Sequence, residues 1–190
     1  MEQIILVFGV KGSGKDYFVE NYKKVFEKLP MANACKEQIV VLKFADPLTK
    51  LFSDIYGIDL SNKILYEDWK LENRHLLQNA GTSLKNIFGK DIFGKYVEAQ
   101  IRKYLSINKD KFTTFIITDL RFLDELQPIL LLAETPIKFY FTNYRSPKYS
   151  LDDSHESEKL AQAWAKADKK EGFYTYTEFM QINSELKLTE

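Results

Sequence analysis

Short apolar runs alternate along the chain with segments whose apolar residues recur at helical spacing. Strands buried inside a parallel sheet are continuously apolar, whereas a helix that covers a sheet is apolar along one side only. The alternation therefore predicts an α/β fold in which a central parallel sheet lies between two layers of helices. The runs expected to form strands are Ile4 to Phe8, Ile39 to Phe44, Phe115 to Ile117 and Ile137 to Phe141.

The helical segments are bounded by residues typical of helix ends, such as proline, glycine and aspartate. The first helix carries apolar residues before Pro30, namely Phe18, Tyr22, Val25, Phe26 and Leu29. The next helices are expected from Asp46 and Pro47 to about Tyr56, where Gly57 ends the helix, and from Tyr66 to Asn79, with closure at Gly81. Later helices carry Val97, Ile101, Tyr104 and Leu105 and occupy the region up to Ala133, with Pro128 in a first turn.

The whole chain, residues 1–190, is expected to form a single domain with a helical insertion over about residues 57–95. Residues 143–158 are rich in charge and follow a late strand, which favours a mobile lid. An ordinary solvated loop has the same composition and stays open as an alternative. Residues 164–190 remain without assigned elements.

A glycine-rich loop, Gly9-Val10-Lys11-Gly12-Ser13-Gly14-Lys15-Asp16, follows the first expected strand. Glycines let such a loop turn its backbone N–H groups inward, and the next helix points the positive end of its dipole at a bound anion. The spacing is typical of a P-loop, so we expect the phosphates of a nucleotide to bind Gly9, Lys11, Gly12, Ser13, Gly14, Lys15 and Asp16. A bare strand-to-helix connection is the alternative, but it needs no lysine in this register.

Asp16 stands where a P-loop usually carries serine or threonine. A carboxylate beside bound phosphates is repulsive unless a divalent cation lies between them, directly or through a water molecule. Asp119, at the end of a predicted strand, is a second candidate for holding a magnesium water. Orienting Arg121, contacting a substrate hydroxyl and capping the strand end are alternative roles for Asp119. We therefore expect Mg²⁺ near Asp16 and Asp119.

Composition excludes several classes of function. The 27 basic and 27 acidic residues cancel, so no net basic field is available to hold a nucleic-acid polymer. The single Cys35 suits a reducing compartment, and its spacing from His75 and His155 does not fit a zinc site. We expect neither a signal peptide nor a membrane-spanning segment, and hence a cytoplasmic protein that binds no membrane.

Arginine is scarce, with only four arginines among the 27 basic residues. A planar guanidinium binds phosphate oxygens in pairs and offsets charge that develops during phosphoryl transfer. Arg121 follows a strand end, Arg145 opens the polar segment, and Arg74 lies before the expected turn at Gly81. We expect these three residues to contact phosphates. Arg102, on the exposed side of a helical pattern, is expected in a surface ion pair.

Five segments, in this order, resemble the deoxynucleoside monophosphate kinases of bacteriophages. They are the Gly9 to Asp16 loop, Phe44-Ala45-Asp46-Pro47-Leu48, Leu76-Leu77-Gln78-Asn79-Ala80-Gly81-Thr82, Ile117-Thr118-Asp119-Leu120-Arg121-Phe122 and Asp153-Ser154-His155-Glu156-Ser157-Glu158. The resemblance extends from Met1 to about Leu160. It implies a P-loop kinase fold and transfer of the γ-phosphoryl group of ATP, with Mg²⁺, to a deoxynucleoside monophosphate in deoxynucleotide biosynthesis. It also implies the host cytoplasm as the location if a phage encodes the chain.

The resemblance implies roles for individual residues. Catalysis would involve Lys15, Asp119, Arg121 and Arg145. The acceptor nucleotide would contact Phe44, Asp46, Trp69, Arg74, Gln78, Gly81, Thr82 and Arg121, with Phe44 and Trp69 as candidates for stacking on its base. The lid would present Arg145, Lys148, Asp153, His155 and Glu158. A homodimer is compatible with the sequence.

Two other functions stay open on the sequence. Animal-type phosphomevalonate kinase shares Ser13-Gly14-Lys15-Asp16 and also has a phosphate monoester as acceptor, but the segment Leu77 to Thr82 favours the nucleotide family. An ATP-driven switch would hydrolyse ATP slowly and accept no small molecule. Because a phosphate monoester is already largely a dianion at neutral pH, its phosphorylation needs cationic clamps and no carboxylate base. The arginines outside the loop therefore count against the switch.

Overall fold

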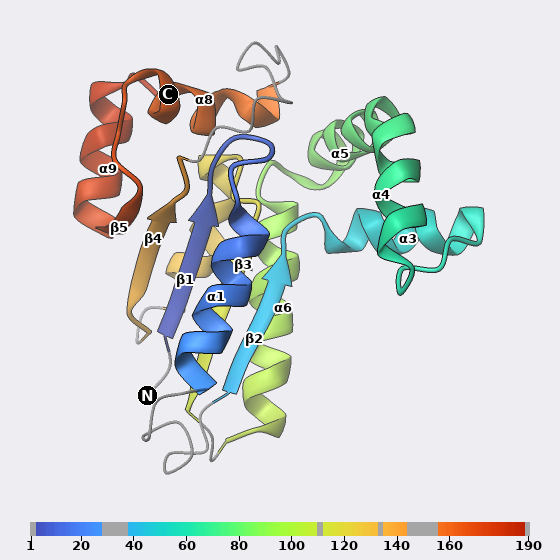
Figure 1. Ribbon diagram of the computed structural model, residues 1–190, viewed down its shortest axis with the longest axis horizontal. Coiled ribbons are helices and arrows are strands. Elements are labelled where there is room, and N and C mark those ends of the chain that lie inside the picture. The colour runs from blue at the N-terminus through green and yellow to red at the C-terminus, as the bar shows by residue number, and fades with distance from the viewer. Residues whose placement is uncertain (1–2, 28–37, 110–111, 133–134, 144–155, 189–190) are drawn as a thin grey trace.

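The structure is a computed structural model that describes residues 3–27, 38–109, 112–132, 135–143 and 156–188 (Figure 1). Within these ranges five strands form one sheet in the order β2-β3-β1-β4-β5. The strands are β1 (Gln3–Phe8), β2 (Gln38–Lys43), β3 (Thr113–Thr118), β4 (Ile137–Phe141) and β5 (Gly172–Thr175). Neighbouring strands pair in parallel except β4 and β5, which are antiparallel. The expected parallel sheet is therefore correct except at this edge.

Helices lie on both faces of the sheet and beyond one of its ends (Figure 1). In the described ranges they are α1 (Lys15–Glu27), α3 (Asp46–Tyr56), α4 (Lys63–Glu72), α5 (Arg74–Phe88), α6 (Ile92–Ile107), α7 (Leu126–Leu130), α8 (Lys159–Lys166) and α9 (Tyr176–Glu185), with the short 3-10 helices η1 (Leu123–Glu125) and η2 (Glu156–Glu158). Figure 1 shows α1 in front of the sheet and α6 behind it. Helices α3, α4 and α5, here called the arm, stand to one side past the end of β2.

Alternate residues of β1 face different helix layers, as the pleat of a strand requires. Ile5 and Val7 pack in a cluster with Val19 of α1. Leu6 packs on the other face in the larger cluster that contains Val97 of α6. Because both faces are covered, the side chains of β1 from Ile4 to Phe8 have no exposed surface. The fold is therefore a three-layer α/β/α arrangement.

The loops after β1 and β3 leave the sheet toward opposite faces. Strand β1 leads into α1 on one face, whereas β3 leads through η1 into α7, which packs against α6 on the other face. The two strands are neighbours, so their diverging loops leave a crevice at the carboxyl ends. Ligands bind at such a point in open parallel sheets. The topology thus sets the Gly9–Asp16 loop beside Asp119 and Arg121.

Helix α3 begins and ends as the sequence predicts. Asp46 is its first residue, Pro47 lies in the first turn, and Gly57 ends it with a left-handed φ of 65°. The expectation that Asp46 caps this helix is wrong, because the N-cap is Ala45 and no side chain caps the helix. The Asp46 carboxylate instead turns back and accepts a hydrogen bond of 3.2 Å from the backbone N–H of Lys43.

The predicted helix from Tyr66 to Asn79 is wrong in both its extent and its end. Two helices, α4 and α5, meet at Asn73, which ends the first and begins the second. The side chain of Asn73 donates to the carbonyl of Trp69 at 2.9 Å and so satisfies a helix-end acceptor. Gly81 lies buried inside α5, where an added Cβ would come within 3.3 Å of Leu48 Cδ1. This glycine therefore permits close packing of α5 on α3 and forms no turn.

The sequence analysis left residues 164–190 unassigned, and the described part of this segment, residues 164–188, contributes to the same core. Trp164 of α8 is fully buried and packs edge-on against Phe8 of β1, with ring centroids 4.9 Å apart. Its indole Nε1 donates to Asn183 Oδ1 of α9 at 2.8 Å, so the buried polar pair is satisfied. These contacts attach α8 and α9 to the central sheet.

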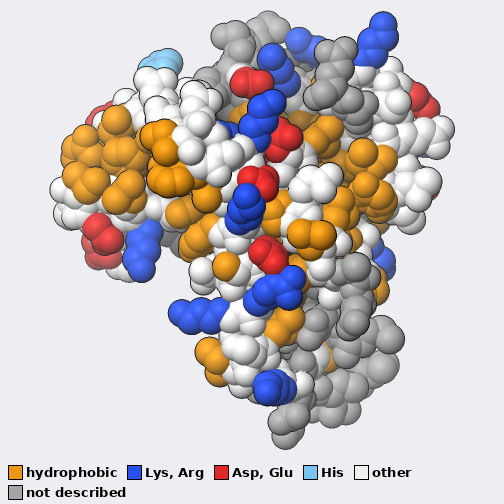
Figure 2. Space-filling view, turned by 180° about the vertical axis from the view of Figure 1, so that it is seen from behind, with side chains coloured by type: hydrophobic (Ala, Val, Ile, Leu, Met, Phe, Trp, Pro, Cys, Tyr) orange, Lys and Arg blue, Asp and Glu red, His pale blue; other side chains and the backbone are white. Residues whose placement is uncertain are grey.

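The face behind the sheet carries both signs of charge side by side (Figure 2). Lys95 of α6 lies 3.0 Å from Asp91, the N-cap of that helix, and Arg102 of α6 lies 2.5 Å from Glu98. The expected surface ion pair of Arg102 is confirmed. None of the helices in the described parts of the chain combines the length and apolar character that crossing a membrane requires.

Candidate functional site

The Gly9–Asp16 loop has a backbone that only glycine adopts readily. Gly12 and Gly14 have φ values of 73° and 86°, in the left-handed region. The Ser13 N–H closes a turn onto the Val10 carbonyl at 3.1 Å, and α1 begins at Lys15. The first N–H groups of a helix lack partners inside the helix, and the dipole makes this end positive. The loop therefore has the backbone features of an anion site.

Gly9 holds the loop against the end of β4. A Cβ on Gly9 would come within 2.1 Å of Thr142 Oγ1 and 2.4 Å of Ser13 Oγ. These two hydroxyls are buried and hydrogen-bonded to each other at 2.5 Å, and Thr142 also donates to the Phe8 carbonyl at 3.2 Å. Only a residue without a side chain leaves room for this contact. The loop is thus anchored to the sheet on its inner side.

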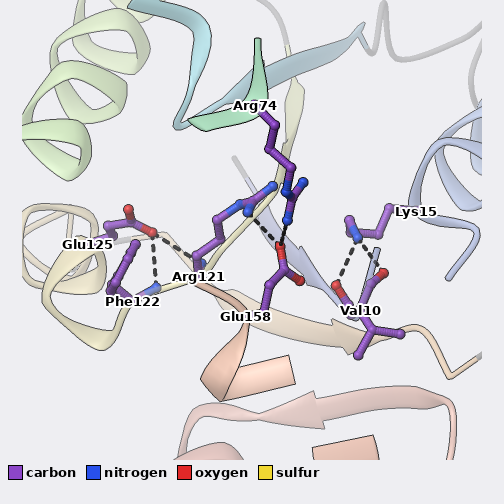
Figure 3. A network of polar contacts seen from close by, with 8 residues as sticks. Val10, Lys15, Arg74, Arg121, Phe122, Glu125 and Glu158 are labelled. Carbon is purple, nitrogen blue, oxygen red and sulfur yellow. Dashed lines mark hydrogen bonds and ion pairs between the residues drawn. The ribbon is translucent and has the colours of Figure 1, made fainter. Parts of the chain in front are cut away.

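Lys15 folds back over the loop. Its Nζ donates to the carbonyls of Gly9 at 2.8 Å and Val10 at 2.9 Å (Figure 3). Burial, together with the positive charge of Arg121, lowers the pKa of Lys15 to about 8. The carboxylates of Asp119, Glu158 and Asp16 act in the opposite direction but do not restore the ordinary value. An anion beside Lys15 would stabilise its charged form.

A cleft of about 600 Å³ extends from the loop to the arm. All the predicted residues of the loop line it, as do Phe44, Asp46, Arg74, Gln78, Gly81, Thr82, Asp119, Arg121 and Glu158. These residues come from segments far apart in the sequence. The structure therefore brings the predicted phosphate-binding residues and most of the predicted acceptor residues into one cavity.

Two arginines meet on one carboxylate in this cleft. Arg121, after β3, donates from Nη1 to Glu158 Oε1 at 2.8 Å, and Arg74, the first residue of α5, donates from Nη2 to the same oxygen at 3.1 Å (Figure 3). The Glu158 side chain is 6% exposed, whereas those of Arg121 and Arg74 are 35% and 25% exposed. The arginines are thus held together by an internal anion while part of each stays accessible.

Glu125 and Lys85 are site residues that the sequence analysis missed. Glu125 is 2% exposed, and its Oε2 accepts hydrogen bonds from the backbone N–H groups of Arg121 and Phe122, both at 3.2 Å. Lys85 of α5 donates to Glu125 Oε1 at 3.3 Å and also lines the cleft. Burial raises the pKa of Glu125 and lowers that of Lys85. Their separation by 40 residues left no local signal in the sequence.

Acidic residues gather around Lys43 at the end of β2. The Nζ of Lys43 lies 3.7 Å from Asp16 Oδ1. Burial disfavours the charged form of Lys43, but the carboxylates of Asp119, Asp16 and Asp46 outweigh it and raise the pKa of Lys43. Burial, together with Asp119, raises the pKa of Asp46. Asp119 has a left-handed φ of 62°, which a short polar side chain tolerates better than most. The positive charge of Lys43, which was not predicted from the sequence, thus lies among the negative charges of three carboxylates.

Trp69 does not lie where the sequence analysis expected it. It is described in the structure but does not line the cleft, and it packs within the arm against Tyr56 and Phe52, with ring centroids 5.5 and 6.4 Å apart. Tyr66, one helical turn earlier, lines the cleft instead and shares a hydrogen bond of 3.0 Å with Thr49. The helical register of α4 turns Tyr66 and Trp69 to different neighbours.

Most of the predicted lid lies outside the described residues. This applies to Arg145, Lys148, Asp153 and His155, and also to Cys35. Glu158 is described and is buried against the two arginines rather than exposed on a loop. Its position adjoins the start of α8.

The acidic residues of the cleft suit a metal ion that arrives with phosphates. Among the described residues, no group of three or more His, Cys, Asp or Glu side chains is placed to hold a metal by itself. Mg²⁺ commonly binds through one or two carboxylates together with substrate phosphates and water. The Asp16 side chain is 87% exposed at the loop, so it is accessible to such an ion. Asp119 and Asp16 thus fit a role as partial ligands.

Comparison with known proteins gives no relative from which to transfer a function. No protein-family model matches the chain, and no curated protein matches it.

Proposed function

We propose that this protein is a P-loop kinase that transfers the γ-phosphoryl group of ATP to a nucleoside monophosphate, with deoxynucleoside monophosphates as the expected acceptors. One observation carries the proposal: a single cleft joins the Gly9–Asp16 loop to Arg74 and Arg121. The loop suits the donor phosphates and the arginines suit the phosphate of an acceptor. A protein that only binds ATP has no need of the second set of cations.

The donor half consists of the loop amides, the start of α1 and Lys15. Lys15 is partly buried beside the loop carbonyls and has a lowered pKa, so its charged form is poorly compensated without a ligand. Phosphate oxygens would supply that compensation. Asp16 and Asp119 would hold Mg²⁺ together with the phosphates, and Mg²⁺ when bound neutralises charge on the transferring group.

The acceptor half consists of the two arginines on Glu158. In the transfer, an oxygen of the acceptor phosphate forms a bond to the γ-phosphorus while the bond to the β,γ-bridging oxygen breaks, and ADP leaves with the electron pair. The acceptor oxygen already carries negative charge at neutral pH, so no side chain has to remove a proton. Arg121 lies near both halves, since its charge affects Lys15 and its guanidinium meets Arg74 on Glu158. It is the residue best placed to offset charge during transfer.

The arm side of the cleft supports a flat acceptor with polar edges. The cleft lining there includes the ring of Tyr66 and the amide of Gln78; Phe44 and Phe93 also line the cleft but are only 2% and 5% exposed. Aromatic rings favour stacking, and an amide offers both a donor and an acceptor to a base edge. An aliphatic acceptor such as phosphomevalonate would use the rings less well.

The test is formation of ADP from ATP and Mg²⁺ with a panel of acceptors. The panel contains deoxynucleoside monophosphates, ribonucleoside monophosphates, phosphomevalonate and no acceptor. We expect nucleoside monophosphates to raise ADP formation well above the rate without acceptor. Lys15→Ala should abolish that increase, whereas Lys90→Ala, an exposed lysine outside the cleft, should retain it.

Two outcomes would overturn the proposal. Stimulation by phosphomevalonate alone would show that the acceptor is phosphomevalonate and not a nucleotide. Tight ATP binding without stimulation by any acceptor would favour an ATP-dependent switch.

A further inference from the structure

Helix α5 is linked to the segment after β3 at two separate points, once through Glu158 and once through Glu125. At its first residue, Arg74 shares the carboxylate of Glu158 with the guanidinium of Arg121. Further along the helix, Lys85 binds Glu125, which holds the backbone of Arg121. One helix of the arm is thus linked to both the side chain and the main chain of the same arginine, as Figure 3 shows for Arg74, Glu158, Arg121 and Glu125.

Glu125 is held closely on all sides. Its side chain is 3% exposed, and that of Lys85 is 13% exposed. The backbone of Glu125 lies against α6 so closely that a Cβ on Gly94 would come within 2.3 Å of the Glu125 carbonyl oxygen. The carboxylate therefore has little freedom to find other partners. A buried charge of this kind is retained only when it is paired and hydrogen-bonded.

Lys85 favours the ionised form of Glu125, whose Oε2 accepts from the two backbone N–H groups. Burial favours protonation of Glu125, and Lys85 is the ion-pair partner that opposes it. Both N–H groups donate to Oε2, and hydrogen bonds to an ionised carboxylate are charge-assisted and therefore stronger than hydrogen bonds to a neutral carboxyl group. Without the lysine, the hydrogen bonds from Arg121 and Phe122 would weaken, and the turn that carries Arg121 would loosen.

We propose that the Lys85–Glu125 ion pair is a positioning device that ties the placement of Arg121 to helix α5 of the arm. The functional part of this inference rests on the proposed kinase function, since it assumes that Arg121 contacts the phosphate of the bound acceptor. Lys85 and Glu125 act through Arg121. Movement of α5 on acceptor binding would then adjust Arg121 through both of its links.

The first experiment measures the turn itself and needs no substrate. Amide hydrogen exchange of the full chain is followed by NMR for Arg121 and Phe122, with Ile116 and Ile117 of β3 as internal references. In Lys85→Met, exchange at Arg121 and Phe122 should rise by roughly tenfold, as expected for loss of a charge-assisted hydrogen bond, while the β3 amides stay unchanged. Lys85→Arg should preserve the protection.

Lys95→Met is the matched control. Lys95 pairs with Asp91 on the exposed side of α6 and does not line the cleft. Its substitution should alter none of these exchange rates. Unchanged exchange at Arg121 and Phe122 in Lys85→Met would overturn the inference.

The second experiment measures binding of the two substrates separately by calorimetry, with a nucleoside monophosphate and with ATP. Lys85→Met should weaken monophosphate binding by roughly tenfold. It should leave ATP binding within about twofold, because the Gly9–Asp16 loop proposed to bind ATP is held between β1 and α1, away from this ion pair. The double variant Lys85→Met/Glu125→Gln should bind the monophosphate as weakly as Lys85→Met, because a neutral glutamine carbonyl accepts from the two amides without charge assistance. Equal losses for both ligands, together with a lowered melting temperature, would indicate a merely structural pair and overturn the inference.

The two proposals fail in different ways. If the wild-type protein binds no monophosphate but Lys85→Met still loosens the turn, the kinase proposal fails and the positioning of Arg121 stands. If the wild-type protein is an active kinase and Lys85→Met changes neither exchange nor monophosphate affinity, the positioning inference fails and the kinase proposal stands.

Discussion

Arg74 and Arg121 donate to the same oxygen of Glu158, at 3.1 and 2.8 Å. The two arginines come from the first residue of α5 and from the segment after β3, and the carboxylate comes from the start of α8. Two guanidinium groups that share one anion are already placed close to each other. A phosphate group, which has more acceptor oxygens than a carboxylate, could replace Glu158 between them.

The first prediction concerns Glu158→Gln. Without ligand the variant should be less stable by about 1 to 3 kcal/mol, because the two guanidinium groups lose their charged partner. Inorganic phosphate should bind the variant roughly tenfold more tightly than the wild type, because an internal competitor is removed. Thermal unfolding at increasing phosphate concentration measures both effects.

Glu156→Gln is the control for this prediction, because Glu156 is exposed and the change in charge is the same. It should bind phosphate as the wild type does. Weaker phosphate binding by Glu158→Gln than by the wild type would mean that Glu158 supports the arginines in the bound state rather than competing for them.

The second prediction concerns pH and Lys15, whose pKa is lowered to about 8. Bound phosphates favour charged Lys15, so its pKa rises in the complex and binding takes up protons. ATP affinity should therefore change little with pH well below 8 and fall as the pH rises above 8, by at most about tenfold per pH unit. Near pH 8 roughly half a proton should be taken up per ATP bound.

Calorimetry between pH 7.5 and 9.5, in buffers with different ionisation enthalpies, measures this proton uptake. Lys15→Met should bind more weakly throughout and lose the uptake that is centred near pH 8. An affinity that is flat over this range in the wild type would contradict the assignment of Lys15 to the phosphates.

The third prediction compares two arginines. Arg121→Lys should lower kcat/KM for the monophosphate by about 100-fold, because an ammonium cannot offer the paired donors of a guanidinium. Its stability should change by less than about 1 kcal/mol, since the charge opposite Glu158 is kept. Arg102→Lys, in an exposed ion pair with Glu98, should leave kcat/KM unchanged. Similar kinetic losses in both variants would argue against a special role of Arg121.

The fourth prediction compares two glycines. Gly9→Ala should destabilise the fold by about 3 kcal/mol and abolish ATP binding, because its Cβ would overlap the hydroxyls of Thr142 and Ser13. Gly57→Ala meets no atom within 4 Å and should cost only about 1 kcal/mol for its left-handed φ. Urea unfolding and ATP titration of the two variants check this difference. Normal ATP binding by Gly9→Ala would show that the loop does not need its contact with Thr142.

The sequence was sufficient to predict the strands of the parallel part of the sheet and the limits of α3. Each of these strands contains a run of mostly apolar residues, and β1 is buried on both faces over Ile4 to Phe8. Strand β5 was not predicted, because its residues alternate between half-buried and exposed positions and pair only with β4 at the edge. The boundary between α4 and α5 was missed because Asn73 gives a weaker signal than proline or glycine.

In the candidate site, too, the sequence predicted only those parts whose residues lie close together in the chain. The Gly9–Asp16 loop could be recognised from the sequence alone, since its conformation depends on glycines and on a helix start that are adjacent in the chain. The partners of Arg74 and Arg121 could not be predicted from the sequence. Glu158 lies 84 residues from Arg74 and 37 from Arg121, and Lys85 lies 40 residues from Glu125. Only the packing of α5, α8 and the segment after β3 around one cleft brings these charges within hydrogen-bonding distance.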